Sequence, residues 1–234
     1  MKFVDDFLKP GLKYRVENEI AIFCESLLFT ANNRKYFSFY NLIAGIYDLG
    51  SWIYYWFHGG EKQVRKSFLD QLVIKPGDNV LEVSIGTGIN LQMLPKNASY
   101  FGIDISYGML KQCQKKLRHA NIEAVLFQAE AENLPFRDGV FDCVFHVGGI
   151  NYFNNKQKAI TEMIRVAKPG SIITLVDETD TFFETFSWIP FLKKIFPTGT
   201  ATQPPLDLLP KSMKKVSIDK IVHGNYWRLS FQKP

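Results

Sequence analysis

Residues 80–88 read Val-Leu-Glu-Val-Ser-Ile-Gly-Thr-Gly, and the next apolar run, Tyr100-Phe-Gly-Ile-Asp, ends on Asp104. The pattern predicts a buried strand, a glycine-rich turn, and a second strand with an acidic residue at its tip. A strand, turn and helix of this kind present backbone N–H groups to a ligand, and the acid suits a ribose diol. A tight turn without a ligand would also need glycines, but the position of Asp104 favours a nucleotide-like cofactor.

The spacing of the glycines narrows the choice of cofactor. A dinucleotide site requires Gly-x-Gly-x-x-Gly, and the third position counted from Gly86 and Gly88 is Leu91. The sequence contains no Gly-x-x-x-x-Gly-Lys-Ser/Thr run of a phosphate-binding loop. The carboxylate of Glu82 would repel a pyrophosphate and could accept hydrogen bonds from an ammonium or from water. S-adenosylmethionine, with an adenosine, a sulfonium and an amino-acid end, fits these features better than NAD or ATP.

Composition indicates a globular protein with a sizeable core. The chain has 234 residues, of which 46% are hydrophobic, and this length suits one large domain or a domain with an appendage. The net charge is +5, but the basic residues are dispersed, which favours solvated helix faces over a nucleic-acid surface. The cysteines Cys24, Cys113 and Cys143 lack metal-ligand spacing and lie among apolar residues. They are interpreted as buried free thiols in a reducing compartment, and no metal is expected.

The N-terminal residues predict a cytoplasmic protein. Met-Lys-Phe-Val-Asp-Asp carries charges within its first six residues and lacks the apolar segment of a secretion signal. No run of about 18 apolar residues exists, so no transmembrane segment is expected. The sequence does not indicate an oligomeric state.

Strand-like and helix-like segments alternate from residue 79 onward. Apolar strands joined by helical crossovers predict a doubly wound, mostly parallel α/β sheet. His223-Gly224-Asn225 separates two further strands and predicts an antiparallel C-terminal hairpin, which brings the sheet to seven strands. The expected strands are 79–83, 99–103, 123–128, 140–147, 171–176, 216–222 and 226–232. The expected helices are 107–117, capped by Ser106, and 156–167, ended by Pro169-Gly170.

The two flanks of this core are expected to differ from it. Residues 1–72 lack strand-like alternation and are interpreted as an N-terminal helical lid, with helices over 19–31, 40–47 and 62–72. Residues 73–234 form the predicted core domain, with an aromatic insert at about 181–210 that holds a helix over 185–196 and a loop over 198–210.

At this point the motifs resemble a known family. Over residues 38–178 the chain is similar to class I S-adenosylmethionine-dependent methyltransferases, in particular to the branch of the ubiquinone and menaquinone biosynthesis C-methyltransferases. The matching segments are Val80–Gly88, Phe101-Gly-Ile-Asp-Ile-Ser, Gln128-Ala-Glu-Ala-Glu-Asn-Leu-Pro-Phe, Phe141-Asp-Cys-Val, and Ala167-Lys-Pro-Gly-Ser. The resemblance implies a Rossmann-like fold and a methyl donor, S-adenosylmethionine, that leaves as S-adenosylhomocysteine.

The resemblance also implies roles for individual residues. The turn would hold the methionine part, Asp104 the ribose hydroxyls, and Ile105 and Met109 the adenine face. Glu130 and the Ala131 N–H would bind the adenine edge, Tyr47 would close over the cofactor carboxylate, and His146 would lie near the transferred methyl. The turn residues are Glu82, Val83, Ser84, Gly86 and Gly88. The family has glycine at the position of Ser84 and Gly-Asp at Ala129-Glu130, so these contacts differ from its usual pattern.

His146 is the candidate catalytic base, because an unperturbed histidine pKa near 6.5 suits proton abstraction. A structural histidine at a strand end is the competing interpretation. The acceptor is expected to be a small molecule, quinone-like or lipid, beneath an aromatic roof. One flank of this roof is the stretch Trp52-Ile-Tyr-Tyr-Trp-Phe-His, for which core packing is the alternative, and the other flank is Phe182, Phe183, Phe186, Trp188, Phe191 and Phe196. Contact of residues 188–196 with a membrane surface is a further interpretation.

Three other functions remain open from the sequence. A nucleic-acid or protein methyltransferase agrees with the charge, although no Asn-Pro-Pro-Tyr or Pro-Cys motif follows residues 140–147. An NAD(P)-dependent oxidoreductase is disfavoured by Leu91 and by the terminal hairpin. A cofactor-binding relative without catalytic activity is the third.

Overall fold

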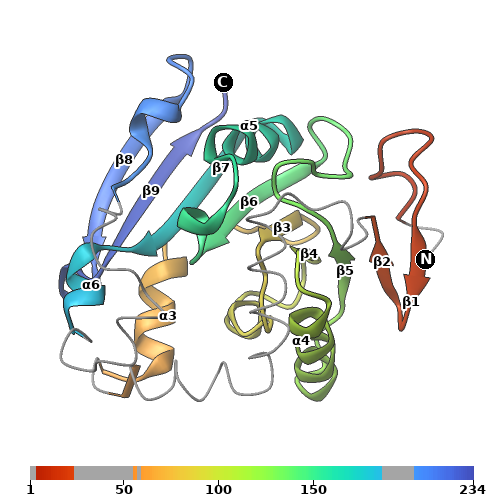
Figure 1. Cartoon of the computed structure of the whole chain (residues 1–234), viewed down its shortest axis with the longest axis horizontal. Coiled ribbons are helices and arrows are strands. Elements are labelled where there is room, and N and C mark those ends of the chain that lie inside the picture. Colours follow the sequence, from red (N-terminus) through yellow and green to blue (C-terminus); the bar gives the residue numbers. More distant parts are fainter. Residues whose placement is uncertain (1–3, 24–54, 57–58, 186–202) are drawn as a thin grey trace.

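The computed structural model describes residues 4–23, 55–56, 59–185 and 203–234, and this part of the chain forms one sheet with helices on both faces (Figure 1). Neighbouring strands follow the order β1-β2-β5-β4-β3-β6-β7-β9-β8. Their bounds are β1 Arg15–Glu17, β2 Ile20–Ile22, β3 Asn79–Val83, β4 Ser99–Asp104, β5 Ala124–Gln128, β6 Phe141–Val147, β7 Ala167–Glu178, β8 Lys214–Ile221 and β9 Tyr226–Gln232. The described helices are α3 Glu61–Leu69, α4 Tyr107–His119, α5 Lys156–Val166 and α6 Asp180–Thr185.

The predicted α/β class is confirmed. Strands β2, β5, β4, β3, β6 and β7 run parallel to one another, while β1 pairs antiparallel with β2, β9 antiparallel with β7, and β8 antiparallel with β9. The strand order turns back on either side of β3, which marks the point where ligands of open α/β sheets bind. The predicted seven strands correspond to β3–β9.

The predicted count of seven strands is wrong because a hairpin from the N-terminal residues extends the sheet. Asn18 and Glu19 adopt left-handed φ angles of 49° and 64° and reverse the chain between β1 and β2. Ile20–Ile22 then pairs with β5 and is completely buried. Residues 19–23 were predicted to start a helix, but a short apolar run that is buried on both faces suits a strand better.

Two cores cover the two faces of the sheet. On one face, Ile160 and Met163 of α5 pack against Leu81 and Phe101. On the other face, helices α3 and α4 pack against the sheet, as Figure 1 shows. The helix predicted over 107–117 buries Leu110, Cys113 and Leu117 there.

Several predicted boundaries shift by a few residues. The predicted helix 62–72 ends at Leu69, and the helix predicted to end at residue 167 ends at Val166, where β7 begins. The lid assigned to residues 1–72 is not confirmed, because residues 24–54 lie outside the described part. The helix predicted over 185–196 is likewise outside it except for its first residue, which ends α6. Within the described residues, no helix is both long enough and apolar enough to cross a membrane.

Candidate cofactor site

The glycine turn follows directly on β3 and has an unusual backbone. Ser84, Gly86 and Gly88 have φ angles of 59°, 55° and 74°, so three residues in five are left-handed. The turn is tied down because the Ile85 N–H donates to the Ile103 oxygen over 2.8 Å. A single 3₁₀ turn, Asn90–Met93, follows in place of the helix that this motif predicts.

Ser84 carries a cost that a glycine would not. A side chain in the left-handed region costs roughly 1–2 kcal/mol, whereas glycine enters it freely. We expect Ser84→Gly to raise the free energy of unfolding by about 1 kcal/mol, part of the gain being offset by the greater unfolded-state entropy of glycine. Urea unfolding measures the difference. Ser84→Ala, which keeps the Cβ, is the control, and an equal gain in both variants would contradict the explanation.

The two glycines of the turn serve different purposes. A Cβ added at Gly88 would lie 2.4 Å from Cys113 Sγ, so this glycine lets α4 pack closely on the turn. A Cβ added at Gly86 would meet nothing within 4 Å. The open side of the turn therefore lies at Gly86. Gly88, which was predicted only to contact the cofactor, also has a packing role that the sequence did not reveal.

Glu82 is buried with one of its two oxygens unsatisfied. The side chain is 1% exposed, and Oε1 accepts a hydrogen bond from Asn90 Nδ2 over 2.6 Å. No described group donates to Oε2. Burial raises the pKa of the Glu82 carboxyl to about 8, against the lowering effects of the Asn90 hydrogen bond and the Arg65 charge. An unsatisfied buried carboxylate oxygen is a place for a positively charged donor.

Asp104 ends β4 and closes the turn from the other side. Its Oδ2 accepts from the Gly86 N–H over 2.9 Å, and its Oδ1 accepts from the Ser106 N–H over 2.8 Å. Burial raises the pKa of this carboxyl to about 6, although backbone hydrogen bonds from Ser106, Gly86 and Ile105 lower it. Each carboxylate oxygen has a second lone pair, so the group can also accept hydroxyl donors.

We expect Asp104→Ala to weaken S-adenosylhomocysteine binding by about 1–3 kcal/mol, because hydrogen bonds to a charged acceptor are lost. Isothermal titration calorimetry measures the effect. Asp142→Ala is the matched control, because Asp142 also accepts a backbone N–H, from Asn79 over 2.9 Å, but at the amino end of the strands. Equal affinities of the Asp104 variant and the unmodified protein would show that Asp104 does not bind the ribose.

The predicted adenine contacts lie beside Asp104. Ser106 caps α4 by accepting from the Met109 N–H over 3.1 Å, and the Met109 side chain is buried. The Ile105 oxygen accepts from Gln128 Nε2 over 3.0 Å, which joins the ends of β4 and β5. Glu130 and Ala131 lie just beyond the end of β5 at Gln128, and Ala131 packs in the core on the α5 face. Their contacts with an adenine stay predictions.

His146 lies in β6 beside Val83 and is completely buried. Its Nδ1 lies 2.9 Å from the Val83 oxygen, so the proton is assigned to Nδ1 and the lone pair to Nε2, which has no partner among the described residues. Burial lowers the pKa of the ring, while the charge of Asp177 raises it. The imidazole is therefore a neutral acceptor held in one tautomer, and its catalytic role stays a prediction.

The structure describes only part of the predicted aromatic roof. Tyr47 lies outside the described residues, as do Trp52–Tyr54, Phe57, Phe186, Trp188, Phe191 and Phe196. Tyr55 is buried in the core, while Phe182 packs against Tyr226 with ring centroids 5.4 Å apart. Trp56 is 66% exposed. Tyr55 therefore packs in the core, as the alternative to a substrate roof had it.

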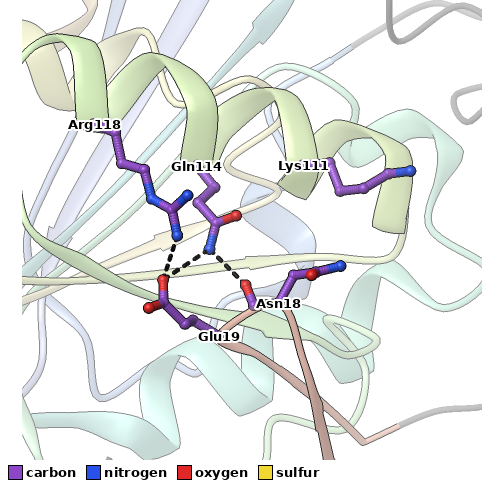
Figure 2. A pocket seen from close by; sticks show the side chains of 5 residues that line it. All are labelled: Asn18, Glu19, Lys111, Gln114 and Arg118. Carbon is purple, nitrogen blue, oxygen red and sulfur yellow. Dashed lines mark hydrogen bonds and ion pairs between the residues drawn. The ribbon is translucent and has the colours of Figure 1, made fainter.

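A surface pocket lies away from these residues, between α4 and the β1–β2 hairpin. Figure 2 shows Gln114 and Arg118 of α4 reaching Glu19, with Arg118 Nη2 2.5 Å from Glu19 Oε2. None of the predicted cofactor residues lines this pocket. We interpret it as the seam where the hairpin joins the helix.

Sequence reasoning missed two polar residues behind the turn. Asn90 is 5% exposed and joins Glu82 to Arg65 of α3, which is 6% exposed. The only sequence signal for Arg65 is a charge next to Val64 within the predicted helix 62–72. Nothing in the sequence pairs it with a residue 25 positions away.

Comparison with known proteins agrees with this geometry. Residues 81–175, which contain the turn, Asp104 and His146, match the family described as "Methyltransferase domain". The chain contains a methyltransferase domain. The match agrees with the predicted methyltransferase family at the level of this domain.

Curated relatives share the domain at moderate identity. The demethylmenaquinone methyltransferase of Corynebacterium kroppenstedtii is 34% identical over 137 residues, which cover 57% of each chain. The ubiquinone/menaquinone biosynthesis C-methyltransferase UbiE of Wigglesworthia glossinidia brevipalpis is 30% identical over 162 residues, or 67% of this chain and 58% of the relative. The chain thus spans a little over half the length of these relatives.

Solved structures share the fold of the methyltransferase domain. The geranyl diphosphate C-methyltransferase of Streptomyces coelicolor, in complex with S-adenosyl-L-homocysteine, superposes with a TM-score of 0.61 at 12% identity. The match covers 76% of this chain and 80% of that one.

The described residues fit S-adenosylmethionine on two observations of this structure. Glu82 Oε2 is a buried acceptor without a described donor, and the space at a Gly86 Cβ is open. Glu82 lies near the end of β3 and Gly86 in the turn that follows it, which Asp104 closes.

Proposed function

We propose that this protein is a methyltransferase that moves the methyl group of S-adenosylmethionine to a small-molecule acceptor. The observation that carries the proposal is the unsatisfied Oε2 of Glu82 beside the left-handed turn. A buried carboxylate oxygen is stabilised by a cationic donor, and the amino-acid end of this cofactor supplies an ammonium. Neither a pyrophosphate nor a phosphate chain would be stabilised there, since both repel a carboxylate.

The residues of the site would bind and orient the reactants. When bound, the cofactor supplies a methyl group that its sulfonium already activates. Glu82 would hold the ammonium and Asp104 the ribose hydroxyls, which fixes the direction of the reactive bond. His146 would accept a proton from the acceptor at Nε2, because its Nδ1 is committed to the Val83 oxygen and burial keeps the ring neutral.

For the acceptor we propose a quinone-like aromatic carbon, with a lipid as the second choice. The names of two relatives, demethylmenaquinone methyltransferase and ubiquinone/menaquinone biosynthesis C-methyltransferase, support the first choice. An aromatic carbon that gains a methyl group loses a proton, and a neutral imidazole is a suitable base for it. Apolar walls around such a site would also exclude water.

A transfer assay with labelled S-adenosylmethionine tests the proposal. The acceptors are a demethylated quinol, phospholipid vesicles, transfer RNA and a basic protein, and mass spectrometry records the gain of one methyl group. We expect label in the quinol, and less label with the Asp104→Ala variant when the donor concentration is limiting. Label in RNA or protein alone would refute the small-molecule acceptor, and absence of label from every acceptor despite cofactor binding would favour a non-catalytic relative.

A further inference from the structure

A buried arginine lies behind the cofactor turn. Arg65 of α3 is 6% exposed, and a guanidinium is costly to bury unless partners satisfy its donors. Its Nε donates to Glu61 Oε1 over 2.9 Å, and its Nη1 donates to Asn90 Oδ1 over 2.8 Å. The guanidinium carbon also lies 5.1 Å from the ring centroid of Tyr55. These contacts hold the arginine in one orientation.

The arginine determines which way Asn90 points. A guanidinium can only donate, so it must face the amide oxygen of Asn90. The amide nitrogen is thereby turned toward Glu82, where Nδ2 donates to Oε1 over 2.6 Å. One oxygen of Glu82 is fixed by this chain of hydrogen bonds, and Oε2 is the one that remains without a described donor.

We propose that Arg65 is a positioning residue for the methyl donor: acting through Asn90, it holds the Glu82 carboxylate so that Oε2 is available to the ammonium of S-adenosylmethionine. The inference rests on the proposed function, because it requires this cofactor at Glu82. By this inference α3 takes part in cofactor binding, although it lies outside the matched residues 81–175.

Electrostatics supports the same assignment. Three charged or titratable groups interact electrostatically with Glu82. Arg65 of α3 and Asp104 of β4 shift the pKa of Glu82, and the charge of Glu82 raises the pKa of Cys113 on α4. Burial and Asp104 raise the pKa of Glu82, to about 8, while Asn90 and Arg65 lower it. An ammonium can pair only with the ionised form, so binding near neutral pH must release the Glu82 proton. By stabilising the ionised form, Arg65 lowers the free-energy cost of releasing the Glu82 proton when the cofactor binds.

Calorimetry with S-adenosylhomocysteine, which retains the amino-acid end, tests the inference. Titrations at pH 8 in two buffers of different ionisation enthalpy yield both the Kd and the number of protons released. The unmodified protein should release about half a proton, since a group with a pKa of about 8 is half ionised at that pH. Arg65→Met keeps an apolar stem but loses the charge and the donor. We expect its Kd to rise at least about tenfold and its proton release to approach one.

Two controls separate positioning from a general structural role. Arg118→Met removes an arginine that is 62% exposed on α4 and should change neither quantity. The second ligand is 5′-methylthioadenosine, which lacks the amino-acid end, and Arg65→Met should bind it as the unmodified protein does. If Arg65→Met does not fold, Asn90→Leu breaks the same chain of hydrogen bonds and should produce the same two changes.

The outcomes distinguish this inference from the proposed function. A folded Arg65→Met protein with unchanged Kd and proton release would overturn the role of Arg65. Equal weakening for both ligands would overturn it as well, because the effect would then not involve the ammonium. If the unmodified protein binds neither ligand, the proposed function fails and the inference fails with it.

Discussion

Replacing Glu82 with Gln is expected to weaken S-adenosylhomocysteine binding by about 2–3 kcal/mol, or roughly 30- to 150-fold in Kd. The substitution keeps the size of the side chain and an oxygen that can accept from Asn90. It removes the charge, and it places an amide donor where the ammonium would bind. Calorimetry at pH 8.5, where the carboxyl of the unmodified protein is mostly ionised, measures the full difference. Glu17→Gln, on the exposed strand β1, is the matched control.

The same pair of proteins should differ in pH dependence. The pKa of Glu82 is raised to about 8, so below this pH the carboxyl holds a proton that an ammonium must displace. Affinity of the unmodified protein should therefore fall about tenfold per pH unit below 8. The Gln variant should lack this slope. Parallel pH profiles for the two proteins would contradict the assignment of Glu82.

Stability should change in the opposite direction to affinity. A carboxyl with a raised folded-state pKa contributes its stability at low pH, and this contribution is lost as pH rises through about 8. Without the cofactor, the buried ionised carboxylate of Glu82 thus lowers the free energy of unfolding, and the Gln variant lacks this destabilisation. We expect the Gln variant at pH 8.5 to unfold at the same or a higher urea concentration, which shows that the residue serves binding at the expense of stability.

Gly88→Ala is expected to lower the free energy of unfolding by about 2–4 kcal/mol. The new Cβ would lie 2.4 Å from Cys113 Sγ, and the residue would keep a φ of 74°. Overpacking of a core costs roughly 1–3 kcal/mol, and a left-handed side chain adds about 1 kcal/mol. Urea unfolding measures the loss.

Two further variants separate these causes. In a Cys113→Ala background the clash is relieved, so Gly88→Ala should cost only about 1 kcal/mol there. A Cβ added at Gly86 would meet no atom within 4 Å, so Gly86→Ala should also lower the free energy of unfolding by only about 1 kcal/mol. Unlike Gly88→Ala in the Cys113→Ala background, it should impair cofactor binding. Similar stability of Gly88→Ala and the unmodified protein would show that α4 does not need the glycine.

The sheet and the turn could be predicted because their signals are local. The strand over 79–83 holds three apolar residues, Val80, Leu81 and Val83, between Pro76-Gly77-Asp78 and the glycines, and the structure has it at the same residues. Ser106 directly precedes an apolar stripe at helical spacing, which is how a capped helix is recognised. The position of Asp104 follows from the length of the second apolar run.

The remaining features depend on contacts between distant residues. Ile20–Ile22 is too short to show alternation, and only its pairing with β5 makes it a strand. The link from Arg65 through Asn90 to Glu82 leaves no periodic pattern, since each residue looks ordinary in its own segment. The packing role of Gly88 likewise appears only once α4 lies against the turn.

Binding of adenosyl ligands tests the cofactor site at Glu82 most directly. Calorimetry compares S-adenosylhomocysteine, S-adenosylmethionine, NAD and ATP against the unmodified protein and against Glu82→Gln at pH 8.5. We expect the unmodified protein to bind both adenosyl ligands, the variant to bind them at least about 30-fold more weakly, and NAD and ATP not to compete. Tight binding of NAD or ATP, with no binding of either adenosyl ligand, would contradict this expectation.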